Sequence, residues 1–207
     1  MTRSPFERDF GPLREQLPRA FVDQYLFSPG ERVVLEGSME RVWRRGRWLW
    51  PIFWLATWPE LLFPETGVGV PVTVDIRQVG SRPCHVWRRN FRFPRRRRRF
   101  TSRMVYDKRL GRVLEGVGPG GALAIAWEMR FEPPSTLHLD AAGWVLRLGP
   151  LRLRLPVWLL GSGRAIETAD ESLPDTIRID LAVSHPFLGD VFGYVGTFTV
   201  TRVPRSR

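Results

Sequence analysis

A carboxylate on an apolar strand face is the most promising chemical group in this sequence. Glu115 lies in the segment Val113–Val117. Alternate residues of a strand point to the same side, so Glu115 shares its face with Val113 and Val117, the two ends of this segment. A carboxylate in such surroundings must be paired, protonated or functional. We therefore treat Glu115 as a candidate general acid or base, with an ion pair to a neighbouring arginine as the structural alternative.

Two hydroxyl groups and one imidazole complete the candidates for acid and base chemistry. Ser102 and Tyr106 share a strand face with apolar neighbours, so both hydroxyls are expected to point into a cavity, although such groups often bond only to the backbone. His185 precedes a proline, which holds it extended, and it follows a strand where a barrel would open. Glu115, Tyr106 and His185 are thus the candidate catalytic residues, and Ser102 is a candidate ligand contact. A role in stabilising the turn is the alternative for His185.

An arginine and several aromatic residues are the other candidate ligand contacts. Arg88 shares a face with Val86 and Asn90, and an inward guanidinium would bind a ligand carboxylate with two hydrogen bonds. The alternative is an outward arginine in a strand that already holds several. The aromatic candidates are Trp54, Trp58, Trp127 and Tyr194.

The sequence lacks the residues that several common kinds of site require. Cys84 is the only cysteine, which leaves no disulfide framework and no cysteine-rich zinc site. His85 and His138 have no partner at metal-ligand spacing, and no HExxH motif occurs. No G-x-S-x-G elbow is present, and the glycine-rich Gly116–Leu123 lacks the lysine of a phosphate-binding loop. We expect neither a metal nor a cofactor.

The N-terminal third predicts helices around a single strand. Residues 5–27 carry apolar side chains at near-helical spacing and predict one or two short helices, interrupted at Pro18. A first strand follows over Arg32–Val42. The tryptophan-rich segment Arg47–Phe63 is apolar nearly all round, but its 17 positions hold two prolines and Glu60. A membrane-spanning helix needs about 20 apolar residues, so we interpret this insert as a buried or lid-like pair of short helices.

From Gly67 onward, short strands alternate with turn residues. The predicted strands are Val70–Val79, Cys84–Phe91, Phe100–Tyr106, Arg112–Val117, Leu123–Phe131, Thr136–Leu139, Trp144–Leu148, Arg164–Thr168, Thr176–Ser184 and Val191–Arg202. Period-two alternation also surrounds Gly149–Pro150, and a helical turn is expected from Pro156. This pattern predicts a mainly β protein, an antiparallel meander that closes into a barrel or half-barrel. The whole chain, 1–207, is expected to form one domain. The order of strand, helical insert and meander resembles the calycin and fatty-acid-binding-protein arrangement.

Several stretches resemble a known bacterial family. They are WRRNF at Trp87–Phe91, GRVLEGVGP at Gly111–Pro119, LPVWLLG at Leu155–Gly161 and DLAVSHPFLGDVFGYVGTF at Asp180–Phe198. Together they are similar to the uncharacterised family called domain of unknown function 4166, over about residues 17–200. Members occur alone or behind a saccharopine-dehydrogenase-like domain. No dinucleotide site is implied for this chain, because its glycine-rich stretch Gly116–Leu123 is predicted to form a hairpin turn. The resemblance implies one domain and assigns no chemistry.

Charge and composition limit which partners and which cellular compartment we expect. The net charge is +11, carried by 32 basic residues of which only Lys108 is a lysine. This skew resembles a coding bias, so nucleic-acid binding is the least favoured function, and an anionic membrane surface is a second partner to test. The charged N-terminus lacks the apolar stretch of a secretory signal. We expect a cytoplasmic protein, with a membrane-peripheral location as the alternative.

The leading hypothesis is binding of an apolar small molecule or lipid inside the barrel. The nine tryptophans, the thirteen phenylalanines and an insert placed where a portal lid would lie support it. The same pocket would also suit a cofactor-free isomerase or cyclase, and the sequence leaves the choice between binder and enzyme open. The alternative is a peripheral membrane or protein-interaction module that uses the tryptophan-rich insert and the arginine-rich surface. The oligomeric state is left open.

Overall fold

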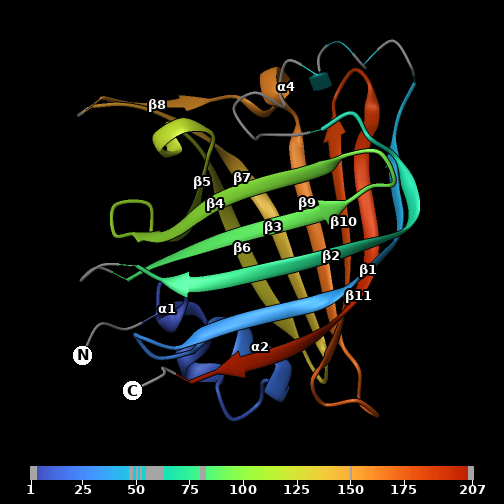
Figure 1. Ribbon diagram of the computed structural model, residues 1–207. Coiled ribbons are helices and arrows are strands. Elements are labelled where there is room, and N and C mark those ends of the chain that lie inside the picture. The colour runs from blue at the N-terminus through green and yellow to red at the C-terminus, as the bar shows by residue number, and fades with distance from the viewer. Residues whose placement is uncertain are drawn as a thin grey trace.

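The described part of the chain forms a closed antiparallel β-barrel (Figure 1). The computed structural model describes residues 4–46, 49, 51, 53–54, 63–79, 83–149 and 151–204. In this part, one sheet of eleven strands has the order β6-β5-β4-β3-β2-β1-β11-β10-β9-β7-β8, and an additional β6–β7 pairing closes ten of them into a ring. The prediction of a mainly β meander that closes is therefore confirmed, and the barrel is complete rather than half-open.

The strand bounds follow the alternation of the sequence closely. The strands are β1 (Arg32–Arg44), β2 (Gly67–Gln78), β3 (Cys84–Arg92), β4 (Arg97–Asp107), β5 (Arg112–Val117), β6 (Leu123–Glu132), β7 (Thr136–Leu148), β8 (Leu151–Leu155), β9 (Ser162–Ala169), β10 (Thr176–His185) and β11 (Gly189–Val203). In β2, the alternate residues Val70, Val72, Val74 and Ile76 are all buried. These side chains face the barrel interior, where the main apolar core lies.

The N-terminal helices cover one end of the barrel, as Figure 1 shows. They are α1 (Glu7–Phe10), the 3-10 helix η1 (Gly11–Leu13) and α2 (Arg19–Tyr25), which begins directly after Pro18. Aromatic side chains from this segment are fully buried, and the rings of Phe6 and Tyr25 meet edge to face with centroids 4.7 Å apart. The prediction of short helices interrupted at Pro18 is confirmed.

One predicted turn is wrong. The DAAG stretch was expected to separate two strands, Thr136–Leu139 and Trp144–Leu148, but both belong to the continuous strand β7. Trp127 pairs with Ala141 and Ala126 pairs with Gly143, so Ala142 is an extra residue in a β-bulge. Gly143 adopts φ 142°, a conformation that favours glycine. The bulge bends the strand without ending it, and local turn composition cannot distinguish the two outcomes.

Strand β7 changes partner along its length. Its first half, Thr136–Asp140, pairs with β9, whereas its second half, Trp144–Leu148, pairs with β8. The second half of β7 also pairs with β6, so β8 alone lies outside the ring of ten strands (Figure 1). The short helix α4 (Val157–Leu160) connects β8 to β9. The helical turn expected from Pro156 is confirmed.

Of the tryptophan-rich insert, the structure describes positions 49, 51, 53, 54 and 63. The first four are helical, and Leu49, Phe53 and Phe63 are buried. These three apolar side chains thus turn toward the protein, whereas Trp54 is exposed. No helix in the described ranges is long and apolar enough to span a bilayer.

Candidate functional site

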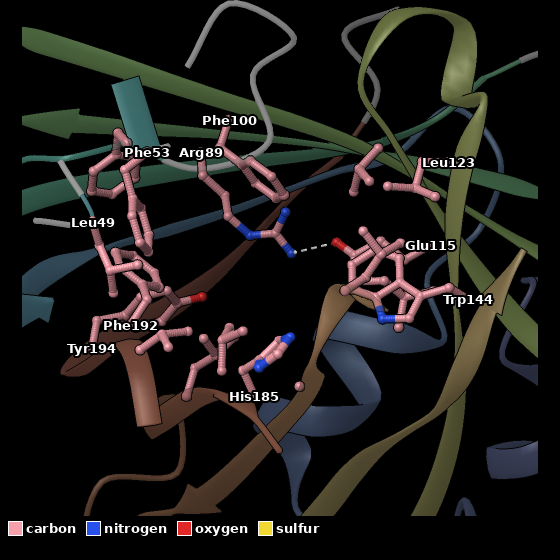
Figure 2. Close-up of a pocket in the computed structure, with 18 of the residues that line it drawn as sticks. Leu49, Phe53, Arg89, Phe100, Glu115, Leu123, Trp144, His185, Phe192 and Tyr194 are labelled. Carbon is pink, nitrogen blue, oxygen red and sulfur yellow. Dashed lines mark hydrogen bonds and ion pairs between the residues drawn. The ribbon is translucent and has the colours of Figure 1, made fainter. Parts of the chain in front are cut away.

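A cavity of about 430 Å³ lies inside the barrel at the end opposite the N-terminal helices. Strands β3–β7 and β9–β11 contribute to its wall, and most of the wall is apolar. The lining residues are Leu49, Phe53, Phe63, Arg89, Phe91, Phe100, Glu115, Val117, Leu123, Ile125, Trp127, Trp144, Leu159, Leu160, Gly163, Leu181, Val183, His185, Leu188, Val191, Phe192 and Tyr194. Figure 2 shows how the few polar groups among them converge on the cavity.

Arg89 is the arginine among the described residues that line the cavity. In β3, its inward neighbours are Trp87 and Phe91, whereas Arg88 is exposed on the outer face. The placement expected for Arg88 is therefore wrong by one residue. Both faces of this strand mix apolar and basic residues, so alternation alone did not identify the inner one. Arg89 lies over the rings of Trp87 and Phe100, each 5.1 Å from the guanidinium carbon.

Glu115 faces the same cavity and is held by side chains from β3 and β6. Arg89 Nη2 lies 3.3 Å from Glu115 Oε1, and Trp127 Nε1 donates a hydrogen bond of 2.8 Å to Glu115 Oε2. Arg89 Nη1 also donates to the hydroxyl of Ser102 at 2.8 Å. Glu115 is thus both paired, as the structural alternative required, and directed at the cavity (Figure 2). Trp127 also lines the cavity, as expected, whereas Ser102 binds Arg89 but is not among the lining residues, so the contact expected for it is not found.

Tyr194, on β11, brings a hydroxyl group to the cavity wall. Burial raises the pKa of Tyr194 to about 12; the charge of Arg89 opposes this shift, and those of Glu115 and Glu167 add to it. The hydroxyl therefore keeps its proton at physiological pH and can donate a hydrogen bond.

His185 lines the cavity from the end of β10 (Figure 2). The backbone N–H of Phe187 lies 3.3 Å from His185 Nδ1, which acts as the acceptor. In the neutral ring, the proton is then on Nε2. The structure brings His185 and Glu115 to one cavity, and the catalytic role suggested for both stays a prediction.

Tyr106 is separated from this group. It lies on the inner side of β4 but near the N-terminal helices, where Arg8 donates a hydrogen bond of 3.3 Å to its hydroxyl. It does not line the cavity. Expecting it beside Glu115 was wrong, because the strand is long enough to carry residues of one face to opposite ends of the barrel.

Two predicted aromatic contacts also fall outside the described cavity wall. Trp54 is 55% exposed and is not among the lining residues. Trp58 lies outside the residues that the structure describes. The insert contributes Leu49, Phe53 and Phe63 to the wall instead.

A second buried polar group, which was not predicted, lies under α2. Glu167 accepts hydrogen bonds from the Tyr25 hydroxyl at 2.8 Å and from Gln24 Nε2 at 3.2 Å. Burial raises the pKa of Glu167 to about 7, although Tyr25, Gln24 and Arg89 oppose the shift. A sequence signal existed, since Glu167 alternates with Ala165 and Ala169, as Glu115 alternates with valines.

Nearby, His85 is fully buried and stacks on Phe27 with ring centroids 4.2 Å apart. Burial lowers the pKa of His85 to about 3, so the ring is neutral. Neither ring nitrogen has a hydrogen-bond partner among the described residues. In the same part of the chain, no three His, Cys, Asp or Glu side chains are grouped so that they could hold a metal ion.

The fold and the site define a closed antiparallel barrel with an apolar interior cavity and a small group of buried polar residues. Residues 17–198 match the family described as a domain of unknown function, DUF4166, and the chain belongs to this family. The chain is also 31% identical over 141 residues to the uncharacterized protein YndH of Bacillus subtilis (strain 168), which covers 66% of this chain and 67% of YndH. The resemblance drawn from the sequence motifs is thus confirmed.

Proposed function

We propose that this barrel binds an apolar small molecule or lipid that carries one neutral polar group. The observation that supports this proposal is an apolar cavity of about 430 Å³ with the Arg89–Glu115 pair in its wall. Ligand cavities in proteins typically measure about 300–1,000 Å³ and combine apolar walls with a few oriented polar groups. The ligand's apolar part would contact the aromatic and aliphatic wall.

That the ligand's polar group should be neutral follows from the pairing of Arg89. Its guanidinium is already neutralised by Glu115 and also bound to Ser102. A ligand carboxylate would have to compete with Glu115 and would place a second negative charge beside it. A hydroxyl or carbonyl would add no charge. It would use the remaining N–H groups of Arg89 or the Tyr194 hydroxyl.

A matched pair of ten-carbon probes tests this proposal. We expect decanol to bind about tenfold more tightly than decanoate in calorimetric titrations near pH 6, because only decanoate brings a charge. In Glu115→Gln, Arg89 loses its counter-charge, so the preference should shift toward decanoate by about tenfold or more. Glu128→Gln is the control, since Glu128 is exposed on β6 and pairs with Arg112 outside the barrel. Failure of both probes to bind, or an unchanged preference in Glu115→Gln, would count against the proposal.

Acid–base catalysis in the same cavity is the second candidate, because Glu115 and His185 both reach it. The same Glu115→Gln protein separates the two functions. If the protein only binds its ligand, Glu115→Gln keeps the wild-type affinity for decanol. For an enzyme, the wild type would also exchange deuterium from D₂O into the carbon next to the carbonyl of a neutral ketone such as undecanone, and Glu115→Gln would not. Absence of wild-type exchange would count against this second candidate.

A further inference from the structure

Strand β8 and helix α4 expose apolar side chains at the end of the barrel where the cavity lies. Leu151 and Leu153 of β8 are 52% and 42% exposed, and Trp158 of α4 is 56% exposed. In the neighbouring β10–β11 turn, Phe187 is 78% exposed. We call Leu151, Leu153, Trp158 and Phe187 the mouth surface. Grouped exposed apolar residues of this size mark a surface that contacts another apolar phase or molecule.

These four residues belong to one region of the fold. Leu151 and Leu153 lie on the same face of β8, which leads through Pro156 into α4. A Cβ added at Gly161, the residue after α4, would lie 2.5 Å from the carbonyl oxygen of Ser184. The end of α4 therefore packs directly against the start of the turn that carries Phe187. Figure 1 shows β8, α4 and this turn at the end of the barrel opposite α1 and α2.

The mouth surface is continuous with the cavity wall. Leu146 of β7 pairs with Leu153 on one side and with Leu123, a cavity residue, on the other. Paired residues of neighbouring antiparallel strands point to the same face. An apolar face therefore runs from Leu123 through Leu146 to Leu153. Leu159 of α4 is 50% exposed and also lines the cavity.

Basic side chains accompany this apolar face. Arg154 is exposed on the opposite side of β8 from Leu153, and Arg45 is exposed beside the β10–β11 turn, where a Cβ on Gly189 would lie 2.7 Å from its guanidinium. Neither forms an ion pair with any residue in the described ranges. The whole chain carries a net charge of +11. Tryptophan with exposed leucines and arginines suits an anionic lipid headgroup region.

We propose that the mouth surface docks on an anionic lipid bilayer, so that an apolar ligand passes between the membrane and the cavity. The passage of ligand rests on the proposed function, whereas docking does not. A bilayer fits because it is itself apolar below a charged layer, so a ligand moving along the continuous face would not cross water.

Vesicle flotation tests the docking. The probe is a vesicle of phosphatidylcholine with about one third phosphatidylglycerol, compared with phosphatidylcholine alone. We expect the wild type to float with the anionic vesicles and to lose about tenfold in partitioning when salt is raised, since surface charge attraction is screened. The double variant Leu153→Ser/Trp158→Ser should lose about tenfold or more in partitioning.

Leu173→Ser is the matched control. Leu173 is 56% exposed, as Trp158 is, but it lies between β9 and β10 beside Asp175, whose carboxylate pairs with Arg19 of α2 at the other end of the barrel. Its partitioning should equal that of the wild type. Equal flotation of the double variant and the wild type would overturn the proposal. A vesicle-independent dimer that only the double variant abolishes would also overturn it, because a second copy would then cover the surface.

Titration with decanol in the absence of vesicles keeps the two proposals separate. Decanol binding by the double variant shows that its barrel is folded, so a loss of flotation then reports on docking. Decanol binding without wild-type flotation overturns the docking alone. Flotation that depends on the mouth surface without decanol binding supports docking and removes the proposed function.

Discussion

Glu167 is a carboxyl group held inside the barrel with two hydrogen-bond donors and no basic partner in direct contact among the described residues. Gln24 donates to Glu167 through Nε2, but its Oε1 has no hydrogen-bond partner in the described part of the chain. A protonated Glu167 supplies an O–H donor and removes a buried charge. This accounts for the direction in which burial shifts its pKa, upward to about 7.

We predict that Glu167→Gln changes the pH dependence of stability. The folded protein holds the Glu167 proton more tightly than the unfolded chain, whose ordinary pKa is 4.5. The stabilisation by the protonated form is therefore complete below that value and is lost as pH rises through about 7. Between about pH 5 and pH 8, the wild type should lose about 2–3 kcal/mol relative to Glu167→Gln. Urea unfolding at both pH values measures the difference.

The control for this measurement is Glu171→Gln, since Glu171 is exposed in the loop after β9. Its stability difference from the wild type should be the same at both pH values. A stability difference for Glu167→Gln that does not change with pH would show that the carboxyl group stays in one protonation state over this range.

At the scale of elements, the packing of β1 between β2 and β11 depends on close backbone approach. Gly37 of β1 pairs with Phe198 of β11 and Val72 of β2. A Cβ added at Gly37 would lie 2.0 Å from the carbonyl oxygen of Thr197, which is backbone and cannot rotate away. The strands would have to separate to admit any side chain.

We predict that Gly37→Ala destabilises the barrel by about 3 kcal/mol, the upper part of the range for overpacked interiors. Chemical denaturation gives the free energy of unfolding. Gly11→Ala is the matched control, because Gly11 lies in the 3-10 helix and its nearest neighbour is the flexible Glu7 side chain at 3.1 Å. That change should stay within about 1 kcal/mol of the wild type. Similar losses for both glycines would exclude the close strand approach as the cause.

For the whole molecule, ligand binding and stability are linked because only the closed barrel has a cavity. We predict that decanol at about 100 times its dissociation constant stabilises the wild type by about 2.7 kcal/mol. For a chain of this length, that corresponds to a rise in melting temperature of about 5–10 °C. Thermal unfolding with and without decanol is the measurement.

A variant with a filled cavity identifies where the ligand acts. Leu181→Trp places an indole ring on the cavity wall, so its melting temperature should not shift with decanol. Leu173→Trp adds the same ring on the surface and should shift as the wild type does. If Leu181→Trp keeps the full shift, decanol stabilises the protein from another site.

The sequence by itself determined most of the strands, the N-terminal helices, the position of the insert and the family. These depend on the local alternation of side chains and on short motifs. Period two also predicted that Glu115 shares an apolar face, and the same reasoning applied to Ala165–Ala169 would have found Glu167. Alternation groups the residues of one face and says nothing about how far along the barrel each residue lies.

Only the tertiary structure decided which face of β3 is inner, since both of its faces mix basic and apolar residues. It therefore placed Arg89 rather than Arg88 beside Glu115. It also moved Tyr106 away from the cavity and left β8 outside the ring of strands. The physical reason is that barrel closure sets which distant strands meet and where each strand begins around the ring. These relations depend on pairing between segments far apart in sequence, and no local pattern contains them.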